Sequence, residues 1–181
     1  MQVADKNKQV RGTILLAILC ALLQLALAPN VAIGNGRANF ALVFAGVVAL
    51  GQGGRRGVVL SFLAGLFFDL CSTEPIGLMA FCLTASSLLL GAECRNRIAG
   101  DLAGSMALFC GSAAAVSLVQ SLAMLLVGQA SSLFDVVVLR ALPTALLTCV
   151  AFVPFAYYYS RVRAAGPNLG RGGGHFSTKG L

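Results

Sequence analysis

The chain is a succession of apolar runs, most of them long enough to cross a membrane, separated by short gaps that hold its basic residues. A membrane-spanning helix needs about 20 mostly apolar residues. The runs are continuous rather than alternating, so they favour helices over the strands of a barrel. The sequence therefore predicts an all-α polytopic membrane protein, a bundle of six transmembrane helices. They cover residues 12–28, 38–54, 57–73, 76–91, 102–128 and 142–159.

Composition agrees with this fold class. Hydrophobic residues make up 58% of the 181 residues and charged residues 10%, and the mean hydropathy is +0.88. Soluble domains usually carry about 25% charged residues. A soluble enzyme, a disordered chain and a secreted disulfide scaffold therefore fit poorly.

The basic residues indicate which way the chain crosses the membrane. All of them except Arg37 and Arg140 lie before the first run, in the gaps after the second and fourth runs, or after the last run. Because cytoplasmic loops are enriched in Lys and Arg, this pattern predicts that both termini are cytoplasmic. It also argues against nucleic-acid binding, which gathers basic residues on one folded face.

The domain organisation follows from the same pattern. Residues 1–11 form a cytoplasmic N-terminal segment, residues 12–160 the six-helix transmembrane domain, and residues 161–181 a basic, Gly-rich cytoplasmic tail that we expect to be disordered. An Ala-Leu-Ala stretch at 26–28 resembles a signal-peptidase site, but Pro29 follows it directly, so we expect the first run to be kept as a span.

No constellation for catalysis or metal binding stands out. The six Cys residues show no CxxC spacing, and the one His, His175, lies far from them in the tail. The six acidic residues form no paired motif, and no nucleophile motif is present. We therefore expect no enzyme activity, no metal and no cofactor.

Asp69 is the most informative polar residue. It follows Phe67 and Phe68 inside the third run, roughly 20 Å from Arg56 along a helix that crosses a core of about 30 Å. A carboxylate inside the membrane is a functional-site hypothesis by default. In the alternative, the helix ends early and Asp69 caps the turn that precedes Pro75. Both interpretations stay open at this stage.

Arg140, at the mouth of the sixth run, falls at a similar depth to Asp69. The two side chains could pair or share a polar pocket near the outer face. In the alternative, Arg140 extends to the lipid headgroups with Asp135 as its partner. Pro143 and Pro154 predict a kinked or interrupted last helix, and Pro143 could separate an outer amphipathic segment, 133–142.

Small residues recur four positions apart on several runs. They allow helix backbones to approach closely in lipid, so they predict helix-contact faces. The pairs are Ala17/Ala21, Ser61/Gly65, Gly100/Gly104 and Gly111/Ala115.

The stretch 57–80, GVVLSFLAGLFFDLCSTEPIGLMA, resembles the signature of the rod shape-determining MreD family. That signature is a Gly-rich helix ending in GLxxD, a short outer turn, and a GL pair that opens the next helix. Leu23-Gln24-Leu25 followed by Pro29, and the segment that begins with Leu142-Pro143, resemble the ends of the family's first and last spans. The similarity covers residues 12–160. Many relatives have a proline just before the second span, and residues 37–40 lack it.

The resemblance implies a non-catalytic scaffold in the bacterial cytoplasmic membrane. Family members act in cell elongation with MreC, a single-span protein. Through it they connect indirectly to the filament protein MreB and to the cell-wall synthase RodA and its partner transpeptidase. Membrane lipid is the other expected partner. The candidate contact or intramembrane polar residues are Gly57, Gly65, Asp69, Gly77, Arg140 and Pro143.

A second function class fits the six runs. Substrate-binding subunits of energy-coupling-factor vitamin transporters use an Ala-xxx-Ala face on their first helix, which Ala17 and Ala21 match. Such pockets usually combine polar and aromatic side chains. This chain has no Trp, and its three Tyr residues all lie at the end of the last run. The scaffold is therefore the favoured interpretation.

Overall fold

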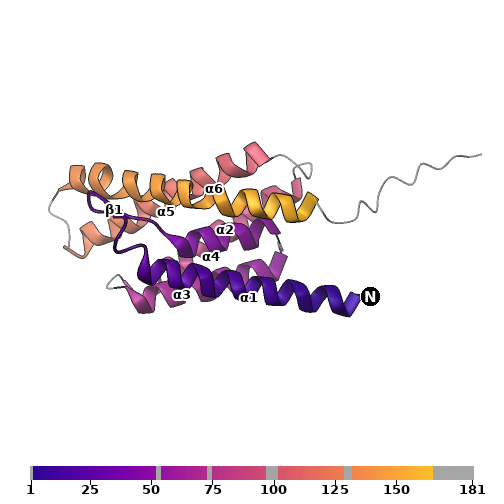
Figure 1. The fold of residues 1–181 in the computed structure, drawn as a ribbon. Coiled ribbons are helices and arrows are strands. Elements are labelled where there is room, and N and C mark those ends of the chain that lie inside the picture. Colours follow the sequence, from indigo (N-terminus) through magenta and orange to yellow (C-terminus); the bar gives the residue numbers. More distant parts are fainter. Residues whose placement is uncertain (1, 52–53, 73–74, 97–101, 129–131, 165–181) are drawn as a thin grey trace, which may run out of the picture.

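The computed structural model describes residues 2–51, 54–72, 75–96, 102–128 and 132–164. Within these residues the chain forms a bundle of six α-helices (Figure 1). A short antiparallel hairpin of β1 (Ala32–Ile33) and β2 (Gly36–Arg37) connects the first two helices, and a π-helical segment, η1 (Asp135–Ala141), leads into the last. The helices are α1 (Gln2–Ala26), α2 (Phe40–Gly51), α3 (Gly54–Cys71), α4 (Leu78–Asn96), α5 (Leu102–Leu126) and α6 (Leu142–Ala164).

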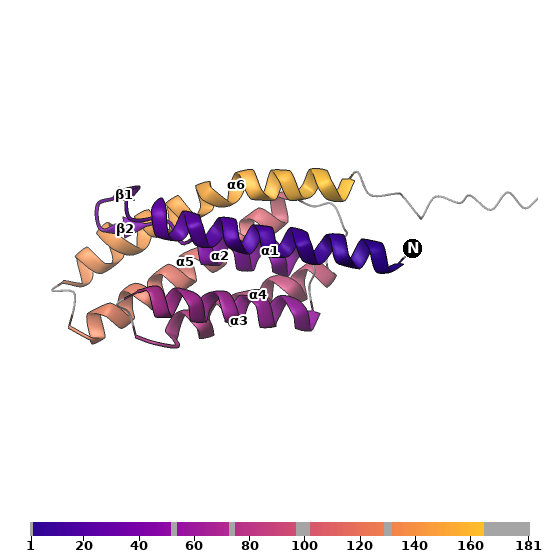
Figure 2. The ribbon, with the colours of Figure 1, turned by 60° about the horizontal axis from the view of Figure 1, so that its bottom comes forward.

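The helices run up and down the bundle, so consecutive connections lie at opposite ends. The N-terminus and the end of α6 lie together at one end, which we call the N-terminal end (Figures 1 and 2). The hairpin lies at the other, the hairpin end. The predicted number and order of helices are therefore confirmed.

Within the described parts of the chain, three helical segments are long and apolar enough to cross a membrane: Gln9–Ala26, Ala103–Leu126 and Val136–Tyr158. Two shorter apolar helical segments are Phe40–Gly51 and Leu78–Ala92. The outer face of α1 shows why the bundle suits lipid, because its large apolar side chains are exposed rather than packed. They include Ile14, Leu15, Ile18, Leu22 and Leu25.

α2 is the central helix, and it is shorter than the predicted span 38–54. Every residue from Phe40 to Ala49 is buried. Its 12 residues rise only about 18 Å, whereas the hydrocarbon core is about 30 Å thick. A short helix is tolerated here because other helices surround it, and non-helical backbone is allowed at membrane depth where protein covers it.

The core on one side of α2 is centred on stacked aromatic rings. The rings of Phe109 and Phe152, from α5 and α6, stack with centroids 3.7 Å apart. Gly46 of α2 makes room for them, since a Cβ at this position would lie 2.5 Å from the Phe109 ring. On the other side, Phe40 and Phe44 pack with Cys20 of α1.

Some helix limits differ from the predicted spans. α1 already begins at Gln2, so most of the predicted N-terminal segment is helical. α6 continues past residue 159 to Ala164, and residues 165–181 of the predicted tail lie outside the described part of the chain. Hydropathy marks where a chain is apolar, and helices continue into the polar interface because their backbone hydrogen bonds do not depend on lipid.

Candidate functional site

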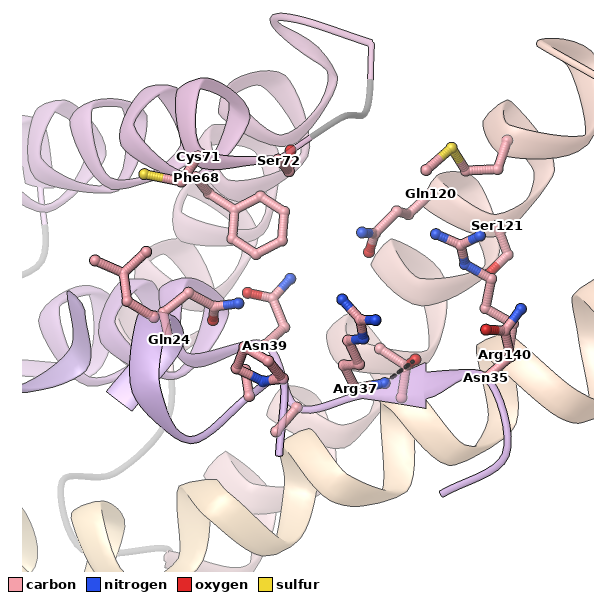
Figure 3. A pocket seen from close by; sticks show the side chains of 16 residues that line it. Gln24, Asn35, Arg37, Asn39, Phe68, Cys71, Ser72, Gln120, Ser121 and Arg140 are labelled. Carbon is pink, nitrogen blue, oxygen red and sulfur yellow. Dashed lines mark hydrogen bonds between the residues drawn. The ribbon is translucent and has the colours of Figure 1, made fainter. Parts of the chain in front are cut away.

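A polar cavity of about 430 Å³ lies at the hairpin end of the bundle (Figure 3). Its walls come from α1, the hairpin, α3, α5, η1 and α6, so residues from the whole length of the chain meet there. The lining includes two guanidinium groups and several amides, contributed by Gln24, Asn35, Arg37, Asn39, Gln120 and Arg140.

Two arginines are among the described residues that line the cavity. Arg37 comes from β2 and Arg140 from η1, and both side chains extend into the space beside Gln120 (Figure 3). Among the described residues that line the cavity, none carries a carboxylate. These two arginines are also the two basic residues that lie outside the segments predicted to be cytoplasmic. The cavity therefore contains Arg140 and Arg37, while Asp69, which we predicted to pair or share a polar pocket with Arg140, is not among its described lining residues.

The start of α2 is fixed by side-chain hydrogen bonds. The Asn39 Oδ1 accepts a hydrogen bond from the Leu42 amide at 3.0 Å, which is an N-cap. The Gln24 Oε1 accepts the Phe40 amide at 2.8 Å. These bonds satisfy amides that the first turn of a helix leaves without partners.

Two threonines of α6 hold the segment between the hairpin and α2. The Arg37 amide donates to the Thr144 Oγ1 at 3.2 Å, and the Asn39 amide donates to the Thr148 Oγ1 at 3.0 Å. The two threonines are four residues apart, one helical turn, so they present both hydroxyls on one face of α6. Arg37 is thereby held at the rim of the cavity through its own backbone.

Pro143 lies where the hairpin crosses the junction of η1 and α6. A Cβ at Gly36 would lie 2.8 Å from the Pro143 Cβ and 2.9 Å from the Arg140 carbonyl oxygen. The hairpin therefore packs directly on this junction. Pro143 is the second residue of α6, but helical backbone continues into it from η1, and it has no amide hydrogen to donate to the Leu139 carbonyl. That carbonyl instead accepts the Asn35 amide of the hairpin at 3.0 Å. The predicted interruption near Pro143 is present as the change from π-helix to α-helix.

Asp69 caps the N-terminus of α4 from the neighbouring helix. It is 1% exposed. Its Oδ2 accepts the amides of Gly77 at 2.9 Å and Ala80 at 3.1 Å, and its Oδ1 accepts the Met79 amide at 3.1 Å. The carbonyl of Gly77 accepts the Phe81 amide, so Gly77 is itself the N-cap residue of α4. Since glycine has no side chain to cap with, Asp69 supplies the missing carboxylate.

Asp69 therefore caps the start of α4, which lies beyond the turn before Pro75 that the capping interpretation assigned to it. α3 ends at Cys71, two residues beyond it. Its neighbours Phe68 and Cys71 line the cavity, while its own oxygens bind the α4 amides. A pairing of Asp69 with Arg140 stays a prediction.

Gly65 lets α3 and α4 touch through their backbones. A Cβ at Gly65 would lie 2.5 Å from the Ala80 Cα and 2.8 Å from the Met79 carbonyl oxygen. Ser61, one turn earlier, is fully buried in α3. The small pair Ser61/Gly65 is therefore a helix-contact face, as predicted, but the contact it makes is with α4 of the same chain.

Gly57 and Gly77 occupy less crowded positions. A Cβ at Gly57 would lie 3.6 Å from the Val48 carbonyl oxygen and 3.7 Å from the Ser87 hydroxyl, which is ordinary contact. Gly77 has φ +94°, a conformation that side-chain-bearing residues rarely adopt. Gly57 therefore lies at the contact of α2, α3 and α4, and Gly77 shapes the turn into α4.

Several polar residues of the site were not among the predicted site residues. Asn39, Gln120, Thr144 and Thr148 are polar residues within or beside apolar runs, and they meet at the hairpin end or support it. That placement is the signal that could have found them, because a polar side chain in an apolar span needs a partner. Among the described residues no three His, Cys, Asp or Glu side chains gather where they could hold a metal ion.

The sequence model described as rod shape-determining protein MreD matches residues 6–161. The chain belongs to the MreD family. It is thus a multi-pass membrane protein with a non-enzymatic, shape-determining function. No curated protein and no solved structure matches the chain.

Proposed function

We propose that this MreD-family protein is a scaffold of the bacterial cell-elongation complex in the cytoplasmic membrane. It crosses the membrane six times with both termini in the cytoplasm and docks an MreC-like single-span protein. Through that partner it supports the RodA and transpeptidase synthases and MreB indirectly. The observation that carries the docking step is a face of small residues on α5 that the bundle leaves uncovered.

The proposed topology is supported by the distribution of charge over the bundle. The N-terminus, the start of α3 with Arg55 and Arg56, and the end of α6 all lie at the N-terminal end (Figure 1). Arg37 and Arg140 lie at the hairpin end. Cytoplasmic loops favour Lys and Arg, so the N-terminal end faces the cytoplasm and the hairpin end faces outward.

Thiol labelling tests this orientation with two positions on α3. Cys71 is exposed at the hairpin end and Arg56 is exposed at the N-terminal end. We expect a membrane-impermeant maleimide, applied to spheroplasts, to label Cys71 and not an Arg56→Cys variant. Mass spectrometry of the labelled peptides separates these sites from the other cysteines. Labelling of Arg56→Cys from outside would contradict the topology.

The docking face lies near the middle of α5. Ala107, Gly111 and Ala115 are spaced one turn apart, and all three are exposed. A Cβ added at Gly111 would meet no atom within 4 Å. In contrast, the Ser61/Gly65 face is covered by α4. Small residues on a lipid-facing helix permit close approach of another helix backbone, so α5 provides a docking position for one transmembrane helix of a partner.

A bulky residue at Gly111 should block this docking position without disturbing the fold. We expect Gly111→Leu to lower the amount of co-expressed MreC-type protein that co-purifies by about tenfold, the effect of about 1.4 kcal/mol. The elution profile of the variant on size exclusion should equal that of the unchanged protein, since the added side chain points into open space.

Gly12→Leu is the matched control. Gly12 is also a helical glycine whose added Cβ would meet no atom within 4 Å, but it lies on α1. We expect this variant to capture the partner as well as the unchanged protein does. Full partner capture by Gly111→Leu would refute docking on α5, and equal loss in both variants would show that the effect is not specific to this face.

The vitamin-transporter alternative is not supported by its own sequence features. Ala17 packs against the cluster of Phe40 and Phe44, so it does not present an open face to a coupling subunit. Phe68 is the one aromatic residue among the 16 described residues that line the cavity.

A further inference from the structure

We propose that the cavity at the hairpin end binds the anionic phosphate headgroup of a lipid from the outer leaflet. The inference rests on the proposed topology for the choice of leaflet. It does not depend on partner docking, because the cavity lies within a single chain. Its three supports are the charge of the lining, the fixed position of its donors, and the apolar wall that leads to the lipid.

The lining is chemically suited to a phosphate group. Arg37 and Arg140 carry two positive charges, and guanidinium groups donate paired hydrogen bonds to phosphate oxygens. The Gln24 Oε1 already accepts the Phe40 amide, so its NH₂ group is the end turned toward Asn39 and the cavity (Figure 3). Among the described lining residues, no carboxylate opposes an anion.

The backbone of Arg37 and the side chain of Asn39 are held in place before any ligand arrives. The backbone of Arg37 is tied to Thr144 and its strand pairs with β1. Asn39 is 4% exposed, caps α2 and is tied to Thr148. Donors that are already ordered lose less conformational entropy on binding. The cavity volume of about 430 Å³ lies within the range of small-ligand sites, about 300–1,000 Å³.

The apolar part of the lining favours a lipid over a soluble anion. Leu25 lines the cavity and is also 53% exposed on the outer face of α1. The wall of the cavity is therefore continuous with the surface on which Leu22 is exposed. A lipid whose headgroup is bound in the cavity can place its acyl chains along α1. A free anion has no apolar group to contact this surface.

Native mass spectrometry tests the proposal on the full-length protein without any partner. The protein is released from nanodiscs that contain equal amounts of phosphatidylethanolamine and phosphatidylglycerol. We expect it to retain the anionic phosphatidylglycerol in preference to the zwitterionic lipid. The double variant Arg37→Gln with Arg140→Gln should retain at least about tenfold less, because it removes both guanidinium groups from the lining.

The double variant Arg55→Gln with Arg56→Gln is the control, since it removes the same charge from the N-terminal end. It should retain the lipid as the unchanged protein does. Equal loss in both double variants, or no preference for phosphatidylglycerol, would overturn the proposal. A further arm adds excess inorganic phosphate. Persistence of the lipid supports the lipid site, and complete displacement by phosphate would show that the cavity takes a free anion instead.

Discussion

Replacing Asp69 with alanine will lower the free energy of unfolding by roughly 3–5 kcal/mol. The carboxylate accepts three backbone amides, from Gly77, Met79 and Ala80, at a buried position. Alanine leaves these amides without acceptors, and α4 has no side chain of its own at Gly77 to replace them. Water cannot easily compensate at a site that other side chains cover. The quantity is measured by denaturant titration of the purified protein in detergent.

Leu70→Ala is the control on the next residue. Leu70 is 70% exposed and faces away from the bundle, so its loss should change the unfolding free energy far less. Asp69→Asn should fall between the two, because the amide keeps one acceptor oxygen and loses the charge. An Asp69→Ala variant as stable as Leu70→Ala would show that the cap contributes little.

The same titration separates capping from an ion pair with Arg140. If Asp69 acts as a cap, Arg140→Gln should leave the unfolding free energy nearly unchanged. A comparable loss in Arg140→Gln, with recovery in the double charge reversal Asp69→Arg with Arg140→Asp, would instead support the pair. The three bonds to the α4 amides lead us to expect no recovery.

The order and number of the helices could be predicted because both depend on features visible along the sequence, namely the length of the apolar runs and the positions of the basic residues between them. A run that is apolar enough must be helical, and basic gaps fix which end faces the cytoplasm. α2 marks the limit of this reasoning. Hydropathy does not distinguish a helix surrounded by lipid from one surrounded by protein, so the buried, 12-residue α2 was expected to be longer.

The site was predictable only for residues whose position along a membrane-spanning helix places them at the hairpin end. Counting residues along a helix brought Asp69 and Arg140 to the same end of the bundle, and this end holds the cavity. Counting residues could not predict that the Asp69 carboxylate accepts the backbone amides of α4, because that interaction depends on where α3 ends. It also omitted Arg37, whose position depends on a hairpin held by Thr144 rather than on a span.

Gly65→Val should separate α3 from α4 and expose the thiol of Cys82. The added Cβ would lie 2.5 Å from the Ala80 Cα and 2.8 Å from the Ala80 amide nitrogen. Both are backbone atoms, so no side-chain rotation relieves the overlap. Overpacking of this kind usually costs about 1–3 kcal/mol and occasionally more. We expect the upper part of this range, because movement of α4 also draws its amides away from Asp69.

Two buried cysteines report where the separation occurs. Cys82 lies in α4, and Cys20 lies in α1 against α2. In Gly65→Val we expect the rate of thiol labelling at Cys82 to rise at least about tenfold, the effect of about 1.4 kcal/mol. The rate at Cys20 should change little, because α1 contacts the other side of α2. Unchanged labelling at Cys82 would contradict the close approach.

Two further variants isolate the cause. Gly111→Ala adds the same kind of atom at a lipid-facing glycine with open space, so it should label like the unchanged protein. Adding Ala80→Gly to Gly65→Val removes the Ala80 side chain but leaves the backbone atoms that the new Cβ would meet. We therefore expect no recovery in the double variant. Recovery would mean that side chains, rather than backbones, set the distance between α3 and α4, and that the glycine contributes packing volume instead of a backbone contact.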